Sequence, residues 1–170
     1  MKHPIINLDQ IELPPRPAAY AAPQNSARKF DGRMGEIGTR IGASKLGYNI
    51  TAVPPGMRAF PCHNHRVNEE MFFILEGSGE VRIGDRTYPL RQGDFLACPP
   101  GGPELAHQIV NTGTTELKYL AVSTMIYPEI CEYPDSGKFL VAEAPRSMAT
   151  AHTFRYVGRP GSNLDYWEGE

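Results

Sequence analysis

Short segments rich in β-branched and aromatic residues alternate with turn sequences from Leu46 to Thr124. The turns contain Gly, Pro, Asp or Asn, as in Pro54-Pro55-Gly56. A segment of about four to eight residues between two such turns has the length of a β-strand and is too short for an ordinary helix. No apolar repeat with helical spacing competes with this pattern. It predicts an all-β barrel or sandwich with strands at 46–53, 70–75, 81–83, 87–90, 95–98, 105–110 and 116–124.

The two ends of the chain differ from this region in their residue pattern. Residues 1–30 carry prolines at positions 4, 14, 15, 17 and 23 and show no periodicity, so they predict an irregular arm ahead of a barrel over residues 31–126. Residues 127–170 predict a C-terminal extension that packs on the barrel, with two more candidate strands at 139–141 and 153–157. We expect Trp167 to hold the tail by burying its ring. The arm has apolar side chains for docking at Ile5, Ile6, Leu8, Ile11 and Leu13.

Length and charge exclude several classes of protein. A chain of 170 residues with 41% hydrophobic and 21% charged residues fits one globular domain. The net charge of -2, with both signs scattered, offers no basic stripe for a nucleic acid. No apolar run is long enough for a membrane helix, and the start resembles no secretory signal. These features predict a cytoplasmic protein with neither nucleic acid nor membrane as a partner.

The three cysteines are odd in number and have no paired spacing. Cys62, Cys98 and Cys131 therefore predict free thiols rather than a disulfide framework. Cys62 precedes His63 and Cys98 precedes Pro99 in the sequence. Cys62 is expected to act as a small buried apolar side chain.

One set of residues has the composition of a metal site. His63 and His65 stand two apart, Glu70 begins the next predicted strand, and His107 lies in the strand predicted at 105–110. Side chains alternate along an extended chain, so the rings of His63 and His65 point to one face. Three imidazoles and a carboxylate suit a divalent transition metal and leave coordination positions open. Single histidines such as His3 and His152 are instead expected to be packed or exposed.

Two blocks around these residues resemble the two conserved motifs of the cupin superfamily. The motifs read G(X)5HXH(X)3-4E(X)6G and G(X)5PXG(X)2H(X)3N, and together they cover about a third of the chain, from Gly56 to Asn111. The matching residues are His63, His65, Glu70, Gly77, Gly93, Pro99, Gly101, His107 and Asn111. The resemblance implies a double-stranded β-helix, or jelly-roll barrel. It also implies one divalent ion (Mn, Fe, Zn or Ni) on His63, His65, Glu70 and His107.

The sequence departs from the motifs at two places. Gly56 precedes His63 by one residue more than the motif has, and Gly101 precedes His107 by three more. The intact spacing from His107 to Asn111 favours a longer loop, and Glu104 then stands where the motif has its histidine. The interval to Gly77 selects Glu70 over Glu69 as the ligand.

The resemblance narrows the function without naming a reaction. Cupins include dioxygenases, decarboxylases, sugar-phosphate isomerases and proteins that only bind sugars or hormones. The leading hypothesis is a metal-dependent enzyme, of isomerase, dioxygenase or decarboxylase type, that acts on a small oxygen-rich molecule. The alternative is a metal-containing protein that binds a sugar or organic acid without turnover.

The remaining expectations concern the surroundings of the ion and the assembly. The sequence assigns no catalytic acid or base, although Tyr48, Arg58 and Tyr119 are candidate polar groups near the site. The arm and the open strand edges predict a homodimer. The side chains expected to wall an apolar pocket are Phe72, Ile74, Leu105 and Ile109.

Overall fold

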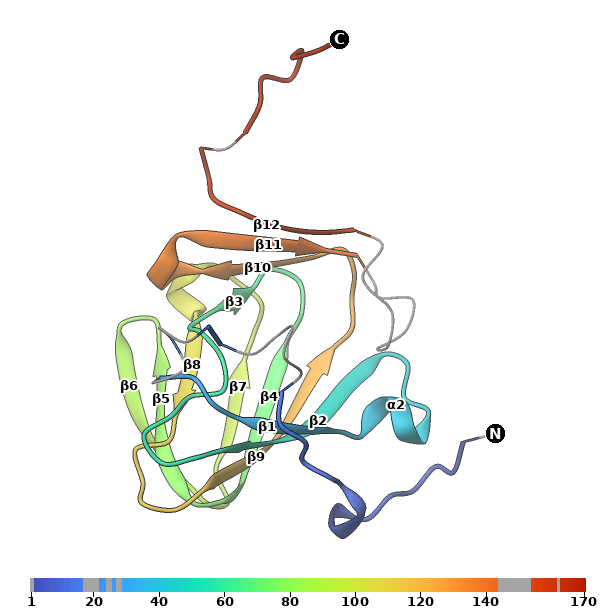
Figure 1. Cartoon of the computed structure of the whole chain (residues 1–170), viewed down its shortest axis with the longest axis vertical. Helices are drawn as coiled ribbons and strands as arrows, with labels where there is room; N and C mark the ends of the chain where they lie inside the picture. Colours follow the sequence, from blue (N-terminus) through green and yellow to red (C-terminus); the bar gives the residue numbers. More distant parts are fainter. Residues whose placement is uncertain (1, 17–21, 24–25, 27–28, 144–153, 162) are drawn as a thin grey trace.

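The computed structural model describes residues 2–16, 22–23, 26, 29–143, 154–161 and 163–170, and within them the strands pair antiparallel in three sheets (Figure 1). The first sheet has the order β1 (Arg33–Glu36), β2 (Leu46–Val53), β9 (Leu117–Thr124), β4 (Glu70–Glu76) and β7 (Phe95–Cys98). The second has the order β12 (Arg155–Gly158), β11 (Lys138–Ala142), β10 (Glu129–Tyr133) and β3 (Asn64–His65). The third has the order β6 (Arg86–Arg91), β5 (Ser78–Ile83) and β8 (His107–Val110).

The helical segments whose bounds the structure gives are all short. The α2 segment is Gly38–Ile41, and 3-10 turns occupy Leu8–Gln10, Pro103–Leu105 and Pro134–Ser136. No helix in this part of the chain is long and apolar enough to cross a membrane.

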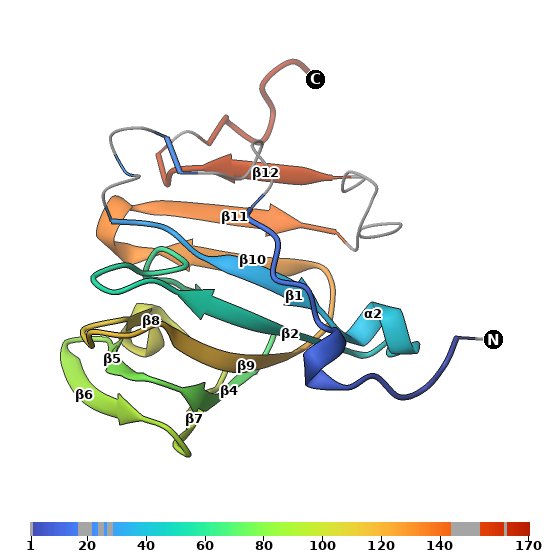
Figure 2. The same ribbon diagram turned by 60° about the horizontal axis from the view of Figure 1, so that its bottom comes forward.

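In the described part of the chain, one isolated backbone bridge joins the second and third sheets. The amide of His63 donates to the carbonyl of His107 at 3.1 Å, and the amide of His107 donates to the carbonyl of His63 at 2.8 Å. Residues 63–65 therefore lie between β10 and β8 and join the edges of these two sheets. In Figure 2, β10, β11 and β12 lie above β5, β6 and β8.

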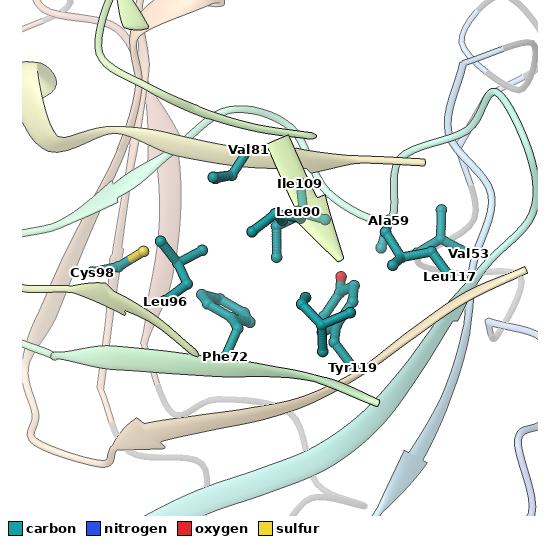
Figure 3. Packing of buried hydrophobic residues seen from close by; sticks show 11 residues of the cluster. Val53, Ala59, Phe72, Val81, Leu90, Leu96, Cys98, Ile109, Leu117 and Tyr119 are labelled. Atoms are coloured by element: carbon teal, nitrogen blue, oxygen red, sulfur yellow. The ribbon is translucent and has the colours of Figure 1, made fainter. Parts of the chain in front are cut away.

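The core lies between the first and third sheets (Figure 3). Alternation along β4 turns Phe72 and Ile74 inward, where they meet Val81 of β5 and Leu90 of β6. Burying these apolar side chains supplies the main driving force for closing the barrel.

Two motif residues have structural roles. Gly77 has φ +80°, and a Cβ there would lie 2.5 Å from the carbonyl oxygen of Glu116, so only glycine fits between β4 and β5. The Asn111 side chain is fully buried and donates to the carbonyls of Val53 and Thr115 at 2.8 Å each. These residues fix the loops at one end of the barrel.

The all-β fold class predicted from the sequence is confirmed, with corrections to some elements. Leu105 belongs to the 3-10 turn that Pro103 begins, so the strand predicted at 105–110 starts only at His107. Strands β1, β3 and β10 were not predicted. The strand predicted at 153–157 corresponds to Arg155–Gly158, and Thr153 and His152 lie outside the described residues.

The two terminal segments differ in how they meet the barrel. A Cβ on Gly35 would lie 2.4 Å from the carbonyl oxygen of Glu12, so residues 11–13 run directly over β1. Ile5 and Leu8 are 72% and 51% exposed, so these two side chains do not dock on the barrel of their own chain. The expectation for Trp167 is wrong, because its ring is 72% exposed on the tail that leaves the barrel (Figure 1).

Candidate metal centre

Three short segments carry the histidines and the glutamate predicted from the sequence. His63 and His65 flank the buried Asn64, whose amide donates to the carbonyl of Gly101 and to the carboxylate of Glu132, both at 2.8 Å. These bonds hold Asn64 on one face of the strand and leave both rings on the other. Glu70 begins β4, and His107 begins β8 opposite His63.

The structure brings all four side chains together around one carboxylate oxygen. Glu70 Oε2 lies 3.0 Å from Nε2 of His107, 3.4 Å from Nε2 of His65 and 3.7 Å from Nε2 of His63. Two ligands that are each about 2.1 Å from one ion lie roughly 3.0–3.4 Å apart at octahedral or tetrahedral angles. Two of the three distances fall in that range, and the third is only slightly longer.

The charges in this cluster favour a cation. Burial lowers the pKa of His63 to about 4, so this imidazole is neutral and ready to coordinate. Burial acts in the same direction on His65, but the carboxylates of Glu129 and Glu70 outweigh it and raise the pKa of His65 to about 9. Burial would also raise the pKa of Glu70, yet His107 and His65 bring it well below its usual range. A metal ion can supply the positive charge that an imidazolium otherwise provides, releasing the proton.

An unsatisfied ring is the observation that fits a bound ion best. Both ring nitrogens of His65 are buried, and neither makes a hydrogen bond of ordinary geometry. Buried polar atoms without partners are rare, and each one calls for an explanation. An ion bound at Nε2 of His65 would satisfy it and leave Nδ1 facing a carboxylate. The residues present therefore fit a divalent metal.

The sequence reasoning missed Glu129 of β10. Its Oε2 lies 3.5 Å from Nδ1 of His65, and it is held by the backbone amide of Asn68 at 3.0 Å and by the Asn68 side chain. Histidine ligands commonly direct their second nitrogen to a carboxylate, which fixes the ring. No spacing rule could find Glu129, because β10 reaches the site by pairing with β3.

Cys131 is a free thiol, as predicted, and it lies beside the cluster, which the sequence did not indicate. It pairs with His65 across β10 and β3, and His63, His65 and Cys131 offer ligand atoms within 4.8 Å of one another, as do His63, Glu70 and His107. Burial raises the pKa of the Cys131 thiol to about 12, so it is protonated unless a metal displaces the proton.

The other sequence candidates do not belong to the cluster, although Cys98 pairs with Glu70 across β7 and β4 and Tyr119 lines a small cavity with His63 and His107. Glu69 is exposed, and Glu104 is exposed with its carboxylate accepting from the amide of Gly102. Cys62 and Cys98 are buried free thiols, as predicted. Tyr119 is buried in the core, where burial raises its pKa above the usual range.

Two cavities border the cluster. The larger, about 260 Å³, is lined by His65 and Glu129 with Glu36, Asn49 and Ser123 as further polar groups, and Tyr48 also lines it. None of its described lining residues is lysine or arginine. The smaller, about 20 Å³, lies against His63 and His107 and has room for about one water molecule.

The expectation of an apolar pocket wall holds only for the smaller cavity. Phe72 and Ile109 line that cavity, whereas Ile74 is fully buried in the core and lines neither cavity. Leu105 packs over Gly101 in the 3-10 turn instead. The larger cavity, of about 260 Å³, is lined by polar and methionine side chains.

Comparison with known proteins places these features in context. A family model described as a cupin domain matches residues 49–123. The chain is 32% identical over 96 residues to protein SchB of Streptomyces halstedii, covering 56% of this chain and 67% of that protein. It is 32% identical over 74 residues to the oxalate-binding protein of Thermotoga maritima, covering 44% and 58%. The matches span 54–67% of the length of the curated relatives.

The similarity to one solved structure extends over nearly the whole chain. A sugar phosphate isomerase of the cupin superfamily from Silicibacter pomeroyi is 25% identical, with a TM-score of 0.77, and the match covers 96% of this chain and 98% of that one. The likeness therefore includes the segments before and after the family match.

Proposed function

This chain belongs to the cupin superfamily, and we propose that it is a metal-dependent protein that acts on a small oxygen-rich molecule. The observation that carries the proposal is the convergence of His63, His65, Glu70 and His107 beside a cavity of about 260 Å³. A divalent ion held there would act as a Lewis acid toward an oxygen donor, or as an oxygen-activating centre if it were iron.

The protein's own groups have distinct parts in this proposal. His63, His107 and Glu70 would hold the ion, and His65 would complete the set while Glu129 keeps its ring in place. Glu36, Asn49 and Ser123 would orient the ligand by hydrogen bonds. A molecule with two oxygen donors, such as a hydroxy acid or an enediol, matches the set of open positions on a cation held this way.

An enzyme is the first choice because the similar structure from Silicibacter pomeroyi is a sugar phosphate isomerase and matches along nearly the full chain. The second candidate is binding without turnover. It is supported by the 32% identity to an oxalate-binding protein and by the lack of an assigned acid or base outside the cluster. Turnover that a chelator abolishes favours the enzyme, and saturable binding without product favours the binding protein.

The test begins with the metal. Elemental analysis of protein purified without added metal should find a divalent ion, and Glu70→Gln and His107→Ala should each reduce it sharply. Glu69→Gln is the matched control, because this neighbouring carboxylate is exposed and lies outside the cluster. Full metal content in both cluster variants would refute the centre.

Ligands are then screened by thermal shift with hydroxy acids, diketones, catechols and sugar phosphates, followed by assays of oxygen uptake and isomerisation. We expect hits that disappear with EDTA and return with the correct ion. Binding that survives both EDTA and the His63→Ala, His65→Ala double variant would show that the ligand does not use the metal.

A further inference from the structure

A second large cavity, about 550 Å³, lies between the N-terminal arm and the turn that joins β10 to β11. It has a composition unlike that of the cavity beside His65, because basic side chains dominate its charged lining. They come from the arm, from the loop after β2 and from the start of β11. These residues are Arg16, Lys29, Arg58 and Lys138.

The basic side chains of this cavity are not paired with acidic side chains of the described residues. Within the described part of the chain, none of the four basic side chains forms an ion pair. Asp135 also lines the cavity, but it accepts two hydrogen bonds from Arg82, at 2.7 and 3.0 Å. Like charges that share a cavity repel one another, so a bound anion would stabilise the arrangement.

Arg58 gives a second, independent sign of a missing ligand. Its Nε is buried and has no hydrogen-bond partner among the described residues, which is costly for a guanidinium. The guanidinium lies 5.9 Å from the ring centre of Phe30, and that of Arg16 lies 4.7 Å from the ring centre of Phe60. Contact with an aromatic face positions a guanidinium and leaves its N–H edges able to donate. One N–H group of Arg16 already donates to the carbonyl of Ala59 at 2.7 Å.

We propose that this cavity binds the phosphate group of a small phosphate ester. A phosphate carries close to two negative charges, and arginine donates to its oxygens in bidentate fashion. The cavity volume is within the range of small-molecule sites. The proposal goes beyond the metal centre, since binding here does not use the ion, although the two sites are neighbours. Tyr133 lines the cavity and its ring stacks on His63, with centroids 6.2 Å apart.

Calorimetric titration of the EDTA-treated full chain tests the proposal. The probes are inorganic phosphate, glucose 6-phosphate and glucose. We expect both phosphates to bind saturably, with an affinity that falls as salt is added, and glucose not to bind. Equal binding of glucose and glucose 6-phosphate, or no binding of either phosphate, would overturn the proposal.

Variants locate the binding. Arg58→Gln and Lys138→Gln should each weaken phosphate binding at least about tenfold. The control is the Lys45→Gln, Arg91→Gln double variant, which removes two exposed positive charges elsewhere and should change the affinity less than about twofold. Equal losses in the control would assign the effect to net charge and refute the site. Lys138 is exposed, so its variant keeps the test valid if Arg58→Gln is unfolded.

The proposal of a metal centre and the proposal of a phosphate site can be refuted independently of each other. Glu70→Gln should lower metal content yet leave phosphate affinity unchanged. If Glu70→Gln loses phosphate binding together with the metal, the phosphate site is not independent of the metal and the proposal is refuted. The metal content of the variant still tests the metal centre.

Discussion

At the scale of single residues, the carboxylate of Glu129 is the main addition to the residues predicted from the sequence, because it supports the ligand His65. It lies 3.5 Å from His65 and reaches the site from β10. Because a carboxylate behind a histidine ligand fixes the ring, Glu129→Gln should weaken metal affinity about 10- to 100-fold. Competition with a fluorescent chelator measures this. Glu69→Gln serves as the control, and equal affinity of the two variants would remove Glu129 from the site.

The three thiols should be unreactive in the folded protein. Burial raises the pKa of Cys98 and of Cys131 to about 12, and Cys62 is 1% exposed. Because the thiolate is the reactive form, little of it exists for Cys98 and Cys131 at about pH 8, where access is also blocked. A colorimetric thiol assay should therefore find about three thiols in denaturant and almost none in EDTA-free native protein. Rapid reaction of one native thiol would contradict this burial.

The sequence predicted the residues of the candidate site better than their surroundings. Alternation places His63 and His65 on one face, and Glu70 begins the next predicted strand. The resemblance to the cupin motifs selects Glu70 over Glu69 and implies that the distant His107 joins the set. Glu129 and Cys131 depend on the pairing of β10 with a two-residue strand, β3. Such a contact between distant segments leaves no local pattern.

At the scale of elements, two glycines offer a matched test of why the β4–β5 connection needs glycine. Gly56 and Gly77 have φ of +77° and +80°. A Cβ at Gly56 would meet nothing within 4 Å, whereas a Cβ at Gly77 would lie 2.5 Å from the Glu116 oxygen. Gly56→Ala should cost about 1–2 kcal/mol of unfolding free energy from its backbone conformation alone. Gly77→Ala should cost at least about 2 kcal/mol more, from overpacking.

Urea unfolding monitored by circular dichroism measures both variants. Similar losses of unfolding free energy would mean that the β4–β5 connection moves easily to make room, so that backbone conformation alone demands glycine at this motif position.

The accuracy of the predicted strands differed from one strand to the next. Strands bounded by clear turns, such as β2 and β7, were placed with the bounds that the structure has. The start of β8 was placed too early, because the turn that begins at Pro103 includes Leu105. The strands β1 and β10 lie where Gly and Pro interrupt the apolar pattern, and tertiary pairing rather than propensity makes them strands.

At the scale of the whole molecule, the arm and the open sheet edges predict a homodimer. β12 and β7 each end a sheet, so among the described residues each has a neighbouring strand on one side only. Light scattering should give twice the chain mass for the full chain. A chain that begins near Lys29 should show a weaker dimer. A monomeric full-length protein would contradict the prediction.

The backbone bridge between His63 and His107 links metal retention to the motion of the barrel. Both amide protons of this bridge belong to residues of the proposed centre. Breaking the bridge separates two ligand-bearing segments and exposes both amides to solvent in the same event. Hydrogen exchange at these two amides would then report how often the centre opens, and that frequency would set an upper limit on the rate at which a chelator can strip the ion by this route.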